Sequence, residues 1–125
     1  MLDHITLPVS DVARSRAFFT AALAPLGYSV LRAFPMPQGE VVGMGVDPKP
    51  DFWLRPATLP IAPTHIAFRA KNRAEVDAFY AAALAAGATD HGAPGPRAQY
   101  HPGYYGAFVL DPDGNNIEAV IHDHR

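Results

Sequence analysis

The feature that most constrains the fold of this chain is an internal duplication. The segment from His4 to Leu23 aligns without a gap with the segment from His65 to Leu84, at an offset of 61 residues. Eight positions are identical, and a ninth pairs Phe19 with Tyr80. Alanine matches arise easily by chance, so the comparison depends on the shared His-Ile and Phe-aromatic pairs. A repeat of this kind predicts two similar supersecondary units that pack together.

Each unit is expected to begin with a strand and continue with a helix. Apolar residues alternate along residues 5–9 and again along residues 66–70, as in half-buried strands. Asp11 and Asn72 occupy equivalent positions and are natural N-caps for the helices that follow. Gly27 and Gly87 stand where a helix commonly ends in left-handed geometry.

Three further strands are predicted after each helix. They are Tyr28–Phe34, Glu40–Val46 and Phe52–Arg55 in the first copy, and Thr89–Gly92, Tyr104–Leu110 and Asn115–His122 in the second. Pro94–Gly103 is read as a long loop found only in the second copy. The predicted fold class is α+β, with two βαβββ modules forming a cupped, open barrel-like sheet. We expect a single domain, with module one at residues 1–56, a linker at 57–63 and module two at 64–125.

Composition narrows the classes of function. The chain has no cysteine, so a metal site must use His, Asp or Glu. A formal net charge of -2 argues against a nucleic-acid partner. Apolar runs stay below the roughly 20 residues that span a bilayer, so no membrane association is expected. Because the first residues do not resemble a signal peptide, we expect a cytoplasmic protein.

Strand alternation gathers polar and aromatic residues on the faces that the helices do not cover. These residues are His4, Thr6, Trp53, Arg55, His65, Arg69, Glu118 and His122. Glu118 lies in the middle of an apolar strand, where an unpaired carboxylate is costly. With His4 and His65 it forms a facial set suited to Zn, Mn, Fe, Co or Ni. The alternatives are a solvated His4, a hydrogen-bonded interior His65, and a Glu118 that pairs with Arg55 or Arg69 in a metal-free cup.

Three motifs resemble the vicinal-oxygen-chelate superfamily, which groups glyoxalases, bleomycin resistance proteins and extradiol dioxygenases. They are the opening segment 3–11 (DHITLPVSD), the segment 64–68 (THIAF) and the segment 110–118 (LDPDGNNIE). The resemblance covers nearly the whole chain, and it implies metal ligands at His4, His65 and Glu118. It does not specify a substrate, because the superfamily includes lyases, isomerases, dioxygenases, thiol transferases and drug-binding proteins.

Details of the motifs distinguish the branches of that superfamily. The four-ligand glyoxalase I pattern would place Glu or Gln where this chain has Trp53, which argues against lactoylglutathione lyase activity. The ligand pattern and Thr6 are similar to fosfomycin-resistance thiol transferases, but the loop at 95–105 does not match their ion-binding and phosphonate-binding loop. Bleomycin-type binders use a similar fold without metal, and the presence of all three ligand residues weighs against that class.

The favoured hypothesis is therefore a divalent-metal-dependent enzyme, of lyase, isomerase, transferase or dioxygenase type, acting on a small oxygenated or electrophilic molecule. Glu118, Tyr100 and His101 are the candidate catalytic residues. The candidate substrate-binding residues are Thr6, Trp53, Arg55, Arg97, Tyr104 and Tyr105. The alternative is a metal-free protein that binds or sequesters a small molecule. We expect a homodimer in which His4 of one chain joins His65 and Glu118 of the other.

Overall fold

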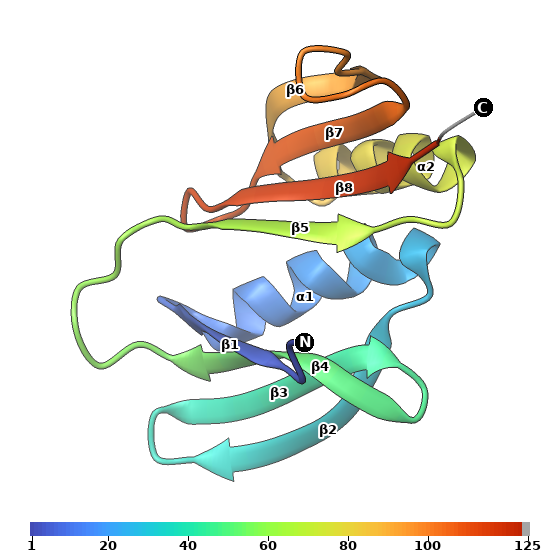
Figure 1. Cartoon of the computed structure of the whole chain (residues 1–125). Helices are drawn as coiled ribbons and strands as arrows, with labels where there is room; N and C mark the ends of the chain where they lie inside the picture. The colour runs from blue at the N-terminus through green and yellow to red at the C-terminus, as the bar shows by residue number, and fades with distance from the viewer. Residues whose placement is uncertain (124–125) are drawn as a thin grey trace.

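The computed structural model describes residues 1–123 and has the predicted order of elements twice. Module one contains β1 (Ile5–Val9), α1 (Val12–Leu23), the 3₁₀ turn η1 (Ala24–Leu26), β2 (Ser29–Met36), β3 (Gly39–Val46) and β4 (Lys49–Pro56). Module two contains β5 (His65–Arg69), α2 (Arg73–Ala85), β6 (Thr89–Pro96), β7 (Tyr104–Leu110) and β8 (Asn116–His122). Figure 1 shows the two modules one above the other.

The two sheets have the same topology, which confirms the duplication. The strand order is β1-β4-β3-β2 in module one and β5-β8-β7-β6 in module two. In each sheet the first strand pairs in parallel with the last, and the other pairs are antiparallel. His65 is the first residue of β5, and His4 directly precedes β1. The predicted α+β fold of two βαβββ modules with an open sheet is therefore confirmed.

The helix boundaries follow the predicted capping residues. The Asp11 side chain accepts a hydrogen bond from the Arg14 backbone N–H, and Asn72 accepts one from Glu75. Such bonds satisfy donors that the first turn of a helix leaves unpaired. Gly27 and Gly87 end the two helical segments with φ values of 87° and 102°. A residue with a side chain rarely adopts this left-handed geometry.

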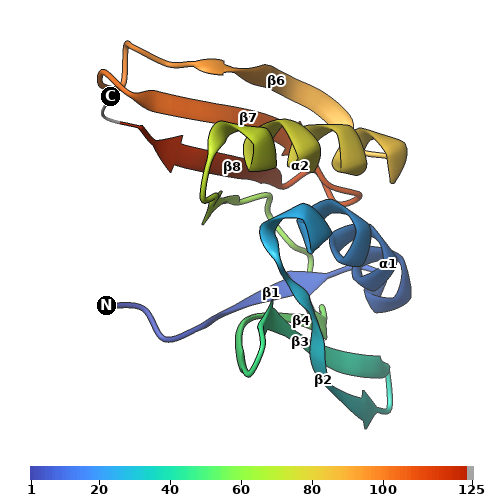
Figure 2. The ribbon, with the colours of Figure 1, turned by 90° about the vertical axis from the view of Figure 1, so that its right-hand side faces the viewer.

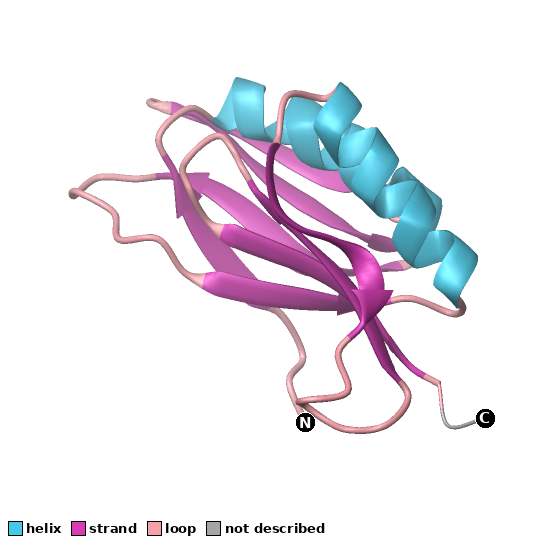
Figure 3. Cartoon of the chain, turned by 90° about the horizontal axis from the view of Figure 1, so that it is seen from above, coloured by secondary structure: helices cyan, strands magenta, loops and turns pink. Residues whose placement is uncertain are grey.

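The helices hold the modules together. α1 and α2 contact each other and lie on one side of the molecule, with the strands on the other (Figures 2 and 3). Between the helices and the sheets, a run of edge-to-face aromatic contacts crosses the module boundary. Phe19 contacts Phe52 of module one, and Phe52 contacts Phe68 of module two at a centroid distance of 5.1 Å. One core therefore serves both modules, and no element of residues 1–123 covers the opposite faces of the sheets.

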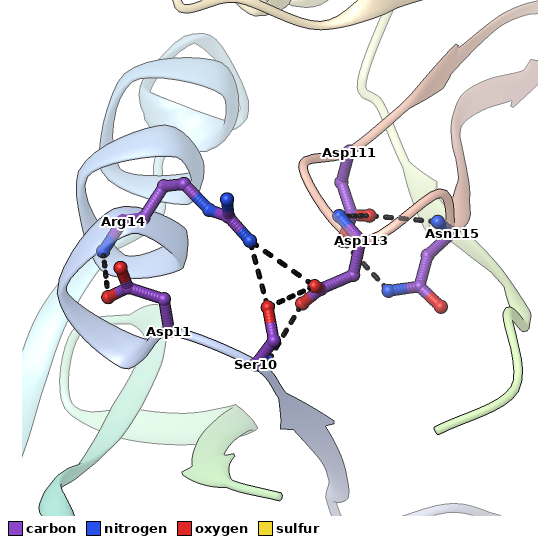
Figure 4. Close-up of polar contacts among 6 residues, drawn as sticks. All are labelled: Ser10, Asp11, Arg14, Asp111, Asp113 and Asn115. Atoms are coloured by element: carbon purple, nitrogen blue, oxygen red, sulfur yellow. Dashed lines mark hydrogen bonds and ion pairs between the residues drawn. The ribbon is translucent and has the colours of Figure 1, made fainter. Parts of the chain in front are cut away.

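A polar cluster also joins the modules at the turn between β7 and β8 (Figure 4). Asp113 accepts hydrogen bonds from the Ser10 backbone N–H at 3.1 Å and from the Ser10 hydroxyl, and it pairs with Arg14 at 3.3 Å. Within the turn, Asp111 accepts bonds from the backbone N–H groups of Asp113 and Asn115. The segment that begins at Asp111 thus forms the turn and ties it to the start of α1.

Three strands extend beyond their predicted ends. β4 spans Lys49–Pro56 rather than Phe52–Arg55. β2 continues to Met36, and β6 continues to Pro96 rather than ending at Gly92, so it includes the first part of the predicted loop. The pairing of β6 with β7 shifts register on both sides of Gly92. An edge strand tolerates the Gly and Pro residues found here, because only one of its sides must pair. Within residues 1–123, neither helix is long and apolar enough to cross a membrane.

Candidate functional site

Glu118 is the centre of the candidate site. It lies in the middle of β8, on the face away from the helices, and its side chain is 1% exposed. Its neighbours across the sheet are Ala67 on β5 and Phe108 on β7. A buried carboxylate needs hydrogen-bond partners. The partners here come from two strands, one on each side of β8.

Each carboxylate oxygen of Glu118 has its own partner. Oε1 lies 2.8 Å from Nε2 of His65, and Oε2 accepts a hydrogen bond from the Tyr104 hydroxyl. The predicted neighbourhood of His65 and Glu118 is thus present within a single chain. Of the partners weighed from the sequence, Glu118 is bonded to His65 and not to Arg55 or Arg69. The Tyr104 bond is a contact that sequence reasoning missed.

An aromatic cluster surrounds Tyr104. Its ring makes edge contacts with Tyr100, His101 and His122, at centroid distances of 4.9, 5.4 and 5.2 Å. The rings of His101 and His122 stack, and Nε2 of His101 lies 2.8 Å from Nδ1 of His122. Burial, followed by the bond to Glu118, raises the pKa of Tyr104 above its usual range. The phenol therefore stays protonated and donates to the carboxylate at neutral pH.

Arg97 supplies positive charge beside this cluster. Its guanidinium lies over the Phe108 ring, 5.4 Å from the centroid, and donates to the backbone carbonyls of Ala93 and Gly95 at 2.8 and 2.9 Å. Phe108 is also within 6.2 Å of the His65 ring, measured between centroids. The backbone bonds hold the guanidinium in place and leave its charge unneutralised by any carboxylate in the described chain.

The corresponding face of module one is aromatic. Trp53 on β4 stacks with Phe34 on β2, with ring centroids 6.2 Å apart and planes 13° from parallel. Thr6 is paired with Trp53 across β1 and β4 and is exposed. Arg55 is exposed two residues further along β4 and donates to the Pro56 carbonyl. These residues share a face, as predicted, but that face belongs to a different sheet from Glu118.

His4 does not join His65 and Glu118 within one chain. Its Nδ1 lies 2.7 Å from Asp3, and its side chain is 54% exposed. His4, His65 and Arg69 line one cavity of about 390 Å³ between the modules. Among residues 1–123 of a single chain, no three His, Asp or Glu side chains come together as a metal site.

Tyr105 lies on the other face of β7. Its hydroxyl donates to Asp77 of α2 at 2.7 Å, and the Arg73 guanidinium lies 4.7 Å from its ring centroid. Successive residues of a strand point to opposite faces. Tyr104 and Tyr105 therefore cannot both reach the Glu118 site, and Tyr105 is the one that packs against the helix.

The pair formed by His65 and Glu118 fits a divalent metal ion. Two ligands on adjacent positions of an ion with bonds of roughly 2.1 Å lie on the order of 3 Å apart. The 2.8 Å between Nε2 of His65 and Oε1 of Glu118 is close to this separation. Imidazole and carboxylate together suit borderline ions such as Zn, Mn, Fe, Co and Ni.

The fold matches known structures. A glyoxalase/bleomycin resistance protein from Albidiferax ferrireducens T118 superposes with a TM-score of 0.78 at 28% identity, over 96% of this chain and 97% of that one. A glyoxalase/bleomycin resistance protein/dioxygenase family enzyme from Burkholderia phytofirmans PsJN gives a TM-score of 0.67 at 21% identity, over 94% and 95% of the chains.

A glyoxalase I variant from Zea mays has a TM-score of 0.69 at 23% identity, and the match covers 95% of this chain but 45% of the maize protein. Among curated proteins, none matches this sequence. The profile of the Glyoxalase/Bleomycin resistance protein/Dioxygenase superfamily matches residues 1–119. Together with the duplicated βαβββ fold, this match means that the chain belongs to the glyoxalase/bleomycin resistance protein/dioxygenase superfamily.

Proposed function

We propose that this chain is a subunit of a divalent-metal-dependent enzyme that acts on a small oxygenated or electrophilic molecule. His65 and Glu118 of one chain and His4 of a second copy would hold the metal. The reaction would be of lyase, isomerase, transferase or dioxygenase type. The observation that carries the proposal is the contact between His65 Nε2 and Glu118 Oε1, made by a carboxylate that is almost completely buried.

The arrangement of the modules supports a second copy as the source of His4. The helices pack against each other within the chain, so the faces that carry Glu118 and Trp53 have no partner in residues 1–123. On module one the uncovered face includes exposed apolar side chains, with Phe34 50% exposed and Met36 42% exposed. A twofold dimer would bury this surface twice and create two equivalent sites. β1 and β5 are edge strands. The unpaired backbone N–H and C=O groups of an edge strand can bind to a second chain, which also favours a dimer.

The residues around His65 and Glu118 would have different roles in the reaction. The metal, when bound, would act as a Lewis acid on the substrate's oxygens. Arg97 would attract an anionic or polar group, while Thr6, Trp53 and Arg55 of the second copy would form the opposite wall. Tyr100 and His101 lie against Tyr104 at the rim. They are the side chains we propose for proton transfer to and from substrate.

Metal content provides the direct test. Protein purified without a chelating tag is expected to bind one transition metal ion per chain, and His65→Ala or Glu118→Ala should abolish stoichiometric binding. His91→Ala serves as the matched control, because it removes an exposed imidazole outside the site. If the wild type remains metal-free at saturating Zn, Mn, Fe, Co and Ni, the proposal is wrong.

Subunit exchange tests the shared site separately. His4→Ala and Glu118→Ala proteins should each lack bound metal. When the two are mixed under conditions that allow exchange, one of the two sites in each mixed dimer regains all three ligands. Metal binding should then return in the mixture. If exchange occurs and binding does not return, the site does not lie across two chains.

The second candidate is a metal-free binding protein, and the stack of Trp53 on the exposed ring of Phe34 favours it. Such a protein would bind aromatic or conjugated molecules against Trp53. Titration of the fluorescence of Trp53 in chelator-treated protein distinguishes the candidates. If ligands from a panel quench the Trp53 fluorescence with the same affinity before and after metal removal, the result supports the metal-free binding protein.

A further inference from the structure

We propose that Tyr104 is a positioning residue that keeps Glu118 a one-oxygen metal ligand, so that an additional position on the metal stays open for substrate. The inference rests on the proposed function and assigns a role that differs from substrate binding. It starts from the unequal surroundings of the two Glu118 oxygens. Oε1 lies beside the other ligand, His65, while Oε2 accepts the Tyr104 hydroxyl on the opposite side.

Gly106 makes this contact possible. It lies on β7 between Tyr104 and Phe108, and it faces Val120 of β8. A Cβ atom at Gly106 would lie 3.2 Å from Oε2 of Glu118 and 3.2 Å from Cε1 of Tyr104. Gly106 does not have a positive φ, so the backbone conformation does not require glycine here. The missing side chain instead leaves the space in which the phenol crosses from one strand to reach the carboxylate on the next.

The Tyr104 ring is held in that direction from its other side. Edge contacts with Tyr100, His101 and His122 surround it, and these residues come from the loop before β7 and from the end of β8. A hydroxyl fixed in this way does not need to reorient to meet Oε2. Partners of this kind fix the orientation of a metal ligand, and their removal typically costs about 10–100-fold in metal affinity or activity.

The number of oxygens that Glu118 donates decides how many metal positions remain. An octahedral ion with two imidazoles and one carboxylate oxygen keeps about three positions, whereas a two-oxygen carboxylate leaves about two. A substrate that binds through two neighbouring oxygens needs two of them. With Oε2 bonded to Tyr104, a position on a bound metal would remain for water or a second reactant beside such a substrate.

Counting the water molecules on bound Mn²⁺ tests the proposal. Wild type, Tyr104→Phe and Tyr80→Phe are loaded with Mn²⁺, and water-proton relaxation gives the number of exchangeable waters. Tyr104→Phe removes the hydroxyl and keeps the ring. Tyr80→Phe is the matched control, because Tyr80 also donates to a carboxylate, Asp90, but does so away from the site, at 2.9 Å.

The expected count falls from about three waters in the wild type and in Tyr80→Phe to about two in Tyr104→Phe. Gly106→Ala is a second variant that keeps every polar group and fills the space under the phenol, and it should give the same lowered count. Equal counts in the wild type and in a folded Tyr104→Phe or Gly106→Ala protein overturn the inference alone. Failure of the wild type to bind Mn²⁺ or any other tested ion overturns the proposed function, and this inference with it.

Discussion

Asp113 is predicted to stabilise the contact between the two modules measurably. Its side chain is 7% exposed, and it accepts two hydrogen bonds from Ser10 and an ion-pair contact from Arg14. A hydrogen bond to a charged group contributes about 1.5–3 kcal/mol when buried. Arg14 is 50% exposed, so its contact adds little. Water can also reach Ser10, which is exposed, after the carboxylate is removed.

The expected loss for Asp113→Ala is therefore about 2 kcal/mol, which lowers the Tm by about 8 °C for a domain of this size. Urea unfolding followed by circular dichroism measures the free energy. Glu40→Ala is the control, because it removes an ion pair with Arg16 that lies within module one and is partly exposed, and it should cost less than about 1 kcal/mol. A loss for Asp113→Ala no larger than that of Glu40→Ala would refute the reasoning.

Three further predictions concern the core, the aromatic face and the response to alkali. Phe19→Ala should cost about 3–5 kcal/mol in urea unfolding, because the ring is fully buried against Phe52; a loss below 1.5 kcal/mol would contradict that packing. Gly43→Ala should shift the emission of Trp53, the one tryptophan, since a Cβ there would lie 2.7 Å from the indole ring; an unchanged spectrum would show that the ring lies elsewhere. Burial and Asp51 raise the pKa of Tyr28, so the stability present at lower pH should be lost as pH rises past about 10. Tm measured from pH 8 to 11 should fall less steeply for Tyr28→Phe, and equal slopes would contradict the assignment.

The fold could be predicted from the sequence because the duplication supplies each module with an independent copy of the same signals. The capping residues Asp11 and Asn72 occupy equivalent positions, and each caps its helix as expected. The face of the sheet on which Glu118 lies could be predicted from the alternation of side chains along an apolar strand. Helix capping and strand alternation depend on residues that are close in the sequence, so their spacing can be read directly from the chain.

Other features depend on contacts that no local pattern displays. The last half of β6 is rich in Gly and Pro, and its pairing with β7 holds it in the sheet despite low strand propensity. Tyr104 and Tyr105 look alike in the sequence, and only the register of β7 separates the one that contacts Glu118 from the one that contacts Asp77. The distance of His4 from Glu118 depends on how the modules pack, which is a tertiary property.

The space above Gly106 has a consequence for the divergence of this superfamily. The size of the residue at position 106 is limited by the side chains of Tyr104 and Glu118, and not by the backbone conformation of Gly106. A larger residue can therefore replace this glycine only if those neighbouring side chains change as well. A relative that acquires a larger residue there must first lose the aromatic hydroxyl at the position of Tyr104. Relatives with the tyrosine should therefore keep the glycine, and relatives with a larger residue at position 106 should lack the tyrosine. The presence of that pair would then separate, by sequence alone, relatives that hold their carboxylate as this chain does from those that hold it differently.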